Sequence, residues 1–261
     1  MMSVDEMTKH NLRILFLGYD RTVTGLVDRL EKAGCAVDQS ADPVKNLQKW
    51  DLTISFGFRH IIKKDVIESA PRPPINLHIG YLPFNRGTHP NFWAFYDGTP
   101  SGVTIHEIDD GIDTGPILVQ EPIVFPQELT TFETTHAYLL QKIETLFAQN
   151  IDDILTGTLK PRAQRGKGTY HRASDLPEGF PGWSENIDSA LDEIHKTAES
   201  TKLDKLEIIA EIERVRANNN INWMDLLRLA FSSSPEEAKQ LVRRINADDR
   251  SISDLFSKLG A

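Results

Sequence analysis

Short apolar runs alternate with amphipathic segments along the first 150 residues, and this order constrains the fold of the chain more than any other feature. Residues 12–18 form an apolar run that ends in glycine, and residues 24–33 follow with Leu26, Val27 and Leu30 on one helical face. A run over 52–58 and a helical pattern over 61–70 repeat the order. Strands that alternate with helices are typical of an open, mostly parallel sheet with helices on both faces. We therefore predict an α/β fold.

Two later strands are predicted to end beside polar side chains. Prolines at positions 71, 73 and 74 stop the second helical pattern, and Asn76-Leu77-His78 follows as the end of a strand in which Asn76 and His78 point the same way. A second alternating run, 102–108, leads into the glycine-punctuated loop that carries Asp113. Strand-end loops carry the ligand sites of many α/β enzymes, so we expect these three side chains to meet.

An amide, an imidazole and a carboxylate can together serve the transfer of an acyl group to an amine. Asn76 would donate to the developing oxyanion, His78 exchanges protons near neutral pH, and Asp113 favours the imidazolium. The sequence leaves open whether His78 or Asp113 accepts the proton of the amine. Taken alone, each motif is better explained by a structural role, with Asn76 as a turn cap, His78 as a hydrogen-bonded core histidine and the Asp-Gly pairs as ordinary turns.

The sequences INLHIGYLP, from Ile75, and DDGIDTG, from Asp109, resemble the signature of the formyltransferases that use 10-formyltetrahydrofolate. The resemblance covers roughly 12–172 and implies a Rossmann-like sheet with Asn76, His78 and Asp113 as catalytic residues. It also implies that 10-formyltetrahydrofolate is the formyl donor. The pterin ring of this donor would be held largely through backbone groups and would lie between two segments. One segment is Phe58, Arg59, His60 and Ile61, and the other is Asp109, Asp110 and Gly111.

Two segments are expected to face the acceptor. The segment FNRGTHPNFW, 84–93, most resembles sugar N-formyltransferases, and Arg86 in it is expected to reach a phosphate or to support the loop. The turn-rich segment 157–174 is basic within an acidic protein, which favours an anionic ligand but equally suits a solvated loop. In the resembling enzymes this segment ends in a strand beside the substrate pocket. Tyr170, His171 and Arg172 are therefore the substrate candidates.

Three residues near these motifs have a simpler expected role. Gly80 stands where many members of the family have Ser, which removes a hydroxyl group and suggests a different acceptor or different packing. His60 and His106 are tempting as extra bases, but a histidine next to an apolar strand is more often structural. His106 alternates within the run 102–108, so we expect it to support the Asp113 loop.

Composition and charge disfavour several other classes of function. The net charge of −9 argues against a nucleic-acid partner, because binding phosphate backbones draws on clustered Lys and Arg. The turn GYDRTVTG, from Gly18, lacks the full G-x-G-x-x-G fingerprint and disfavours NAD or FAD. The single Cys35 gives no disulfide and no metal-site spacing, so no metal is expected. No apolar run is long enough for a bilayer, so we expect a cytoplasmic protein without a membrane partner.

The last quarter of the chain is predicted to be helical only. We divide the chain into a catalytic domain, 1–185, and a helical module, 186–261, with Ser234 as the N-cap of its last helix. The module carries no cluster of residues for chemistry. A homodimer formed through its apolar faces and a monomer whose tail folds back both remain open. Apolar residues recur at helical spacing in three segments, namely Leu206, Ile209 and Ile212; Trp223, Leu226, Leu227 and Ala230; and Leu241, Val242 and Ile245.

The leading hypothesis is a sugar N-formyltransferase. It would move the formyl group to the amino group of a nucleotide-linked amino-deoxysugar, in the synthesis of a surface polysaccharide such as lipopolysaccharide O-antigen or of a sialic-acid-like sugar. Formylation of glycinamide ribonucleotide or of methionyl-tRNA uses the same three residues and is the alternative reaction, although transfer-RNA enzymes usually carry a basic C-terminal domain. A non-catalytic scaffold that retains the folate fold is the alternative outside the enzymes.

Overall fold

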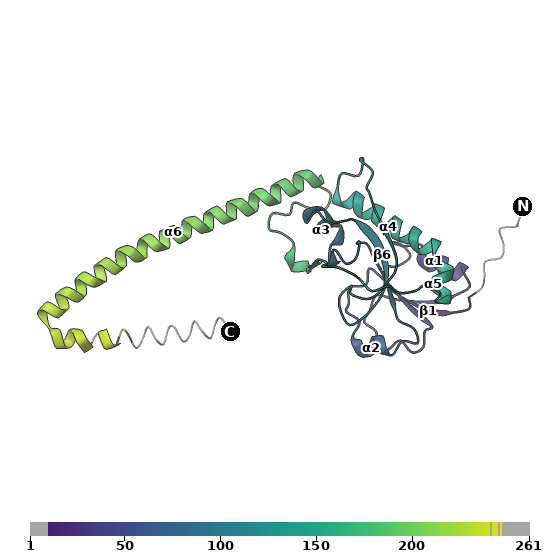
Figure 1. Cartoon of the computed structure of the whole chain (residues 1–261), viewed down its shortest axis with the longest axis horizontal. Helices are drawn as coiled ribbons and strands as arrows, with labels where there is room; N and C mark the ends of the chain where they lie inside the picture. The colour runs from purple at the N-terminus through teal and green to yellow at the C-terminus, as the bar shows by residue number, and fades with distance from the viewer. Residues whose placement is uncertain (1–9, 241, 245, 247–261) are drawn as a thin grey trace, which may run out of the picture. The chain divides into compact units, whose positions relative to one another are not determined.

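A six-stranded sheet in the order β2-β1-β3-β4-β6-β7 organises the first of two compact units, Met1–Lys196 and Thr197–Ala261, in the computed structural model (Figure 1). The structure describes residues 10–240, 242–244 and 246. Four neighbouring strands run parallel, namely β2 (Ala36–Ser40), β1 (Arg13–Gly18), β3 (Leu52–Phe56) and β4 (Ile75–His78). The last two are antiparallel to their neighbours, namely β6 (Gly102–Glu107) and β7 (Ile117–Pro122). The predicted mostly parallel, Rossmann-like sheet is confirmed.

Helices cover both faces of the sheet, because strand residues that point to opposite sides are apolar. On one face, Ile14 and Phe16 pack in a core to which three helices contribute, namely α1 (Leu26–Lys32), α4 (Phe132–Gln149) and α5 (Ile151–Thr156). On the other face, Leu15 and Leu17 pack with Val66 of α2 (Lys64–Glu68). In Figure 1, α1, α4 and α5 lie together and α2 lies apart from them. This arrangement confirms the helices predicted on both faces.

The second predicted helix is much shorter than its sequence pattern. The expected helix over 61–70 is reduced to α2, in which only Val66 is buried. Because helices in proteins are stabilised mainly by packing an apolar face, one buried side chain does not hold a helix of ten residues. Residues 57–63 instead form a loop in which Ile61 is 77% exposed. The loop is thereby free to face a cavity.

A third apolar cluster gathers around α3 (Pro90–Tyr96), a helix that the sequence did not predict. Phe92 and Trp93 pack there with Phe132 and with the first turns of α6 (Ile187–Ser233), through Ile187, Ala190 and Ile194. Just before α3, β5 (Arg86–Gly87) pairs in parallel with β8 (Tyr170–His171), which leads into the short 3-10 helix η1 (Ala173–Asp175). The strand predicted at the end of the segment 157–174 is thus confirmed.

The tail contains one long helix where the sequence predicted several short ones. α6 is continuous over 47 residues, and its sequence holds no Gly or Pro that would end it earlier. The chain breaks at Ser234 and is helical again from 235, which confirms the predicted helix start, whereas Leu241 and Ile245 lie outside the described residues. The division at 185 and 186, and the tail's role, stay predictions. In the described part of the chain, no helix has the length and apolarity needed to cross a membrane.

Candidate active site

Strand β4 places Asn76 and His78 on one face and pairs them with β6. Asn76 lies opposite His106 in this antiparallel pair, and His78 lies opposite Thr104. Asn76 is partly buried, whereas His78 and His106 are buried. The pairing therefore brings a third polar side chain, that of His106, beside the two residues predicted to be catalytic.

Asp113 reaches the same place from the loop between β6 and β7. Its backbone adopts the left-handed region with a φ of 51°, and the side-chain amide of Gln164 donates to the carbonyl oxygens of both Asp113 and Gly115 at 2.8 Å. The N–H of Gly87, in β5, donates to Asp113 Oδ2 at 2.9 Å. The short β5–β8 sheet thereby helps to fix the carboxylate.

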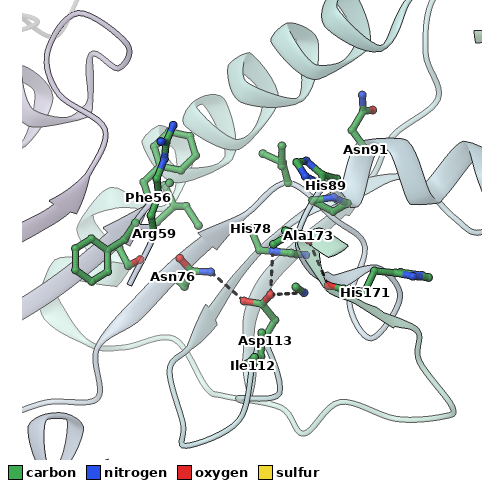
Figure 2. Close-up of a pocket in the computed structure, with 18 of the residues that line it drawn as sticks. Phe56, Arg59, Asn76, His78, His89, Asn91, Ile112, Asp113, His171 and Ala173 are labelled. Atoms are coloured by element: carbon green, nitrogen blue, oxygen red, sulfur yellow. Dashed lines mark hydrogen bonds and ion pairs between the residues drawn. The ribbon is translucent and has the colours of Figure 1, made fainter. Parts of the chain in front are cut away.

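The carboxylate of Asp113 lies among three polar side chains, of which Figure 2 labels Asn76 and His78. Asn76 Nδ2 donates to Asp113 Oδ1 over 3.3 Å, and His78 Nδ1 lies 3.6 Å from Oδ2. His106 Nε2 lies 3.4 Å from Oδ1 and 3.2 Å from Asn76 Nδ2. The convergence predicted for Asn76, His78 and Asp113 is confirmed. His106, which we expected to support the Asp113 loop, contacts Asp113, and its supporting role stays a prediction.

Main-chain carbonyl groups fix which nitrogen of each ring carries a proton. His78 Nε2 lies 3.1 Å from the carbonyl oxygen of Asn85, and His106 Nδ1 lies 2.8 Å from that of Glu107. Because a carbonyl oxygen only accepts, both of these nitrogens must donate. His78 Nδ1 and His106 Nε2 therefore face Asp113 and are the nitrogens that can gain a proton.

The pKa values of Asp113 and His78 are both lowered, which favours an ionised carboxylate beside a neutral imidazole. Burial would raise the pKa of Asp113, but the attraction of His78, the contact with His106 and the Gly87 N–H together hold it well below its usual range. Burial lowers the pKa of His78, and the nearby Asp113 offsets this only in part. At neutral pH, these shifts favour an ionised carboxylate that faces a neutral His78 imidazole, and the attraction that lowers the pKa of Asp113 acts once His78 is protonated.

Gly80 leaves room for the ring of His78. A Cβ atom at Gly80 would lie 2.6 Å from His78 Nε2 and 2.9 Å from its Cδ2, with Pro90 only 3.2 Å away. The sequence indicated only that a hydroxyl group was missing at this position. The structure adds a steric reason, because a Cβ atom on this backbone would push against the imidazole unless the ring moved.

A cavity of about 1130 Å³ surrounds the cluster. Figure 2 shows Asn76, His78 and Asp113 between its two ends. One end is marked by Phe56 and Arg59 and the other by residues of the β5–β8 region, of which His89, His171 and Ala173 are drawn. The volume exceeds the range of about 300–1,000 Å³ that is usual for a site with one small ligand. Two ligands could therefore meet at the cluster from opposite ends.

Comparison with known proteins identifies the family. The formyltransferase PseJ from Anoxybacillus kamchatkensis, whose structure holds UDP-4,6-dideoxy-4-formamido-L-AltNAc and tetrahydrofolate, is 37% identical to this chain. The similarity covers 70% of this chain and 99% of that one, with a TM-score of 0.63. The model of the formyl transferase family matches residues 28–147. The chain belongs to the formyl transferase family.

Curated members of the formyl transferase family differ in their acceptors. A methionyl-tRNA formyltransferase from Thermodesulfovibrio yellowstonii is 33% identical over 135 residues, which are 51% of this chain and 44% of that protein. A dTDP-4-amino-4,6-dideoxyglucose formyltransferase from Mycobacterium tuberculosis is 28% identical over 132 residues, which are 51% of this chain and 55% of that protein. The chain thus spans about half the length of these relatives. Their similarity identifies the family and not the acceptor.

The cavity is lined by most of the residues that were predicted to bind folate. Six of the seven line it, namely Phe58, Arg59, His60, Ile61, Asp109 and Gly111. Asp110 does not line it, and its carboxylate lies 3.9 Å from Lys64 Nζ. Within the described residues, no group of three or more His, Cys, Asp or Glu side chains could hold a metal ion.

The predicted substrate residues divide in the same way. Tyr170, His171 and Arg172 line the cavity, whereas Arg86 does not, and its Nε donates to the carbonyl oxygen of Thr169 over 3.4 Å. His171 is already engaged, because its Nε2 lies 2.8 Å from Asp97 Oδ2 and its ring stacks on Trp93 with the centroids 3.7 Å apart. Tyr170 and Arg172 are exposed and remain available to a ligand.

Sequence reasoning missed part of the cavity wall. Glu133, His136 and Trp183 line the cavity together with His89, which belongs to the segment 84–93 that was expected to face the acceptor. They come from the start of α3, from α4 and from the segment before α6, so no sequence motif joins them. The one available signal was Trp183, a large aromatic residue in the turn-rich segment PEGFPGW, from Pro177. Such a residue in a loop is unusual without a partner to bury it.

Proposed function

We propose that this chain transfers the formyl group of 10-formyltetrahydrofolate to the amino group of a nucleotide-linked amino-deoxysugar. The observation that carries the proposal is the position of the Asp113 carboxylate, which contacts Asn76 and His78 in the middle of a two-ended cavity. The similarity to a formyltransferase solved with a nucleotide-linked formamido sugar and tetrahydrofolate, over 99% of that chain, supports the choice of both ligands.

The folate end of the cavity suits the donor. The loop Phe58, Arg59, His60 and Ile61 offers an aromatic ring, an exposed aliphatic side chain and a cation to a flat ligand with an acidic tail. Across the cavity, the Asp109 loop is stiffened by its own hydrogen bonds, since Asp109 Oδ1 accepts from the Gly111 N–H at 3.1 Å and from Thr114 Oγ1 at 2.6 Å. When bound, the donor supplies a formyl carbon that an amine can attack.

Asn76 is placed to stabilise the negative charge that develops on the formyl oxygen. Its amide donates over 3.3 Å to Asp113 and lies 3.2 Å from His106 Nε2, and both distances are long for hydrogen bonds. An oxyanion is a stronger acceptor, so one N–H can turn to it. Loss of one such donor typically costs about 10²–10³ in rate.

His78 is the proton acceptor that the geometry favours. The amine nitrogen bonds to the formyl carbon and loses a proton, while the bond from that carbon to the folate nitrogen breaks and this nitrogen gains a proton. Asp113 is a weak base because its pKa is held so low, whereas the neutral His78 can take a proton at Nδ1. Asp113, 3.6 Å away, then stabilises the imidazolium, and the same proton can return to the folate nitrogen.

The preferred acceptor is a 4-amino-4,6-dideoxy sugar linked to UDP. The similar formyltransferase from Anoxybacillus kamchatkensis carries a UDP-linked 4-formamido sugar, and the more distant enzyme from Mycobacterium tuberculosis is named for a dTDP-linked 4-amino sugar. Synthesis of a surface polysaccharide or of a sialic-acid-like sugar in the cytoplasm would use such a product. We extend the proposal to this setting.

Methionyl-tRNA is the second candidate acceptor, because the methionyl-tRNA formyltransferase from Thermodesulfovibrio yellowstonii is 33% identical over its matched part. The net charge of −9 disfavours it, since a transfer RNA is bound through clustered cations. Glycinamide ribonucleotide would use the same cluster, and a scaffold would not need it. The nucleotide sugar remains the proposal.

The test is a transfer assay followed by mass spectrometry. The full chain is mixed with 10-formyltetrahydrofolate and a panel of UDP- and dTDP-linked 3-amino and 4-amino sugars, glycinamide ribonucleotide and methionyl-tRNA. We expect one nucleotide sugar to gain the mass of a formyl group, and the Asn76→Ala variant to lose this activity while still binding tetrahydrofolate. Formylation of the tRNA or ribonucleotide alone, or of no acceptor by a chain that binds folate, would refute the proposal.

A further inference from the structure

Trp183 presents a half-exposed ring to the end of the cavity that lies away from the folate loop. The residue belongs to the segment between η1 and α6 and lines the cavity together with His89, Tyr170 and Arg172. Its side chain is 41% exposed. The catalytic cluster makes no use of it.

The Trp183 ring is held firmly from behind. Its centroid lies 4.6 Å from that of Phe180 and 5.0 Å from that of His89, and its edge meets the rings of Phe92 and Phe132 at 6.4 and 6.3 Å. The backbone is also fixed, because the Trp183 carbonyl oxygen accepts the N–H of Glu133 at 2.9 Å, at the start of α4. The ring is therefore preorganised before any ligand binds.

If Trp183 served only to anchor the segment between η1 and α6, its side chain would be expected to be buried. Trp93 belongs to the same aromatic region and is only 4% exposed, as expected for an indole whose function is packing. Trp183 instead remains 41% exposed and lines a concave, ligand-sized space. Planar aromatic ligands stack well on such a surface, and every nucleobase has a face that can do so.

A cation stands on the same wall of the cavity. Arg172 is exposed and follows β8 directly, and a guanidinium group is well matched to the oxygens of a diphosphate. A stacking ring and a cation together suit a nucleoside diphosphate, with the sugar then extending toward Asn76 and His78.

We infer that Trp183 is the stacking platform for the nucleobase of the substrate, and so a residue that sets the affinity of the acceptor site for the nucleotide. The inference rests on the proposed function, since it assigns the nucleotide to the end of the cavity opposite the folate loop. Stacking alone does not choose between bases, so Trp183 would set affinity for the nucleotide and leave the chemistry at the formyl carbon unchanged.

The test uses UDP as the probe and the full chain. Binding is measured by calorimetry and by tryptophan fluorescence, since the chain has four tryptophans in all. We expect UDP to quench the fluorescence of the wild-type protein and Trp183→Phe to lose most of that quenching. Trp183→Ala should weaken UDP binding by about 5- to 100-fold, while the Kd for tetrahydrofolate stays within about 2-fold.

Trp50→Phe is the matched control. Trp50 packs with Leu15 and Val66 on the face of the sheet that α2 covers, and it does not line the cavity. It should retain both the quenching and the affinity. If Trp183→Ala fails to fold, the Trp183→Phe quenching decides. Quenching that persists in Trp183→Phe, or a UDP Kd unchanged in folded Trp183→Ala, overturns the inference.

The same experiment separates this inference from the proposed function. A wild-type chain that formylates a nucleotide sugar, but whose UDP affinity does not depend on Trp183, refutes the platform alone. A wild-type chain that binds tetrahydrofolate but neither UDP nor dTDP, and formylates no nucleotide sugar, refutes the proposed function and the platform with it.

Discussion

Replacing Gly80 with Ala should disable the candidate site through a single added methyl group. The new Cβ would lie 2.6 Å from His78 Nε2, whereas ordinary contacts begin near about 3.5 Å, so the ring must move by about 1 Å. His78 is buried and already 3.6 Å from Asp113, and its Nε2 donates to Asn85 over 3.1 Å. A misplacement of about 1 Å at a reacting centre typically costs about 10² in rate, and we expect kcat to fall by about that factor.

The assay follows formyl transfer under saturating substrates, together with thermal unfolding. Overpacking of this kind also destabilises a protein by about 1–3 kcal/mol, so a moderate fall in Tm should accompany the loss of kcat. Gly25→Ala is the matched control, because a Cβ at Gly25 meets no atom within 4 Å and its φ of −84° suits any residue. A folded Gly80→Ala protein with kcat within about 3-fold of the wild type would refute this reasoning.

Three further predictions concern the polar cluster. Asn76→Ala should lower kcat by about 10²–10³, measured in the transfer assay, with the Kd for tetrahydrofolate little changed. The pKa of His78, followed by NMR, should lie below about 6.5 because burial penalises the imidazolium. Asp113→Asn should lower this pKa further, because it removes the negative charge that stabilises the imidazolium. A higher His78 pKa in the variant would contradict the coupling of the two residues. His106→Leu removes the ring that contacts the Asn76 amide and helps to position it, so kcat should fall by roughly 10-fold in a protein that still folds. An unchanged kcat would show that His106 only packs.

Local sequence signals were sufficient for most of the sheet and for the convergence of Asn76, His78 and Asp113. Asn76 and His78 alternate on one short strand, and Asp113 follows the neighbouring strand in a loop, so strand geometry alone brings them together. The helix predicted over 61–70 is shortened to α2, and Ile61, at the start of the predicted span, is exposed and lines the cavity. Periodicity shows which residues share a face but not what that face meets.

Part of the second end of the cavity could not be predicted because it is assembled from distant segments. His89, His136 and Trp183 meet only after α3, α4 and the segment before α6 have packed around Phe92 and Phe132. The importance of Gly80 was hidden for a related reason. Its role depends on the space beside the His78 ring, and the sequence does not encode that distance directly.

The most direct test of the account is a crystal structure of the chain with tetrahydrofolate and the formylated UDP-linked sugar bound together. We predict the new formamide carbon between Asn76, His78 and Asp113, with its oxygen within hydrogen-bond distance of Asn76 Nδ2 and the folate on the side of Phe56 and Arg59. A formamide bound away from these three residues, or an Asp113 carboxylate turned out of contact with His78, would contradict it.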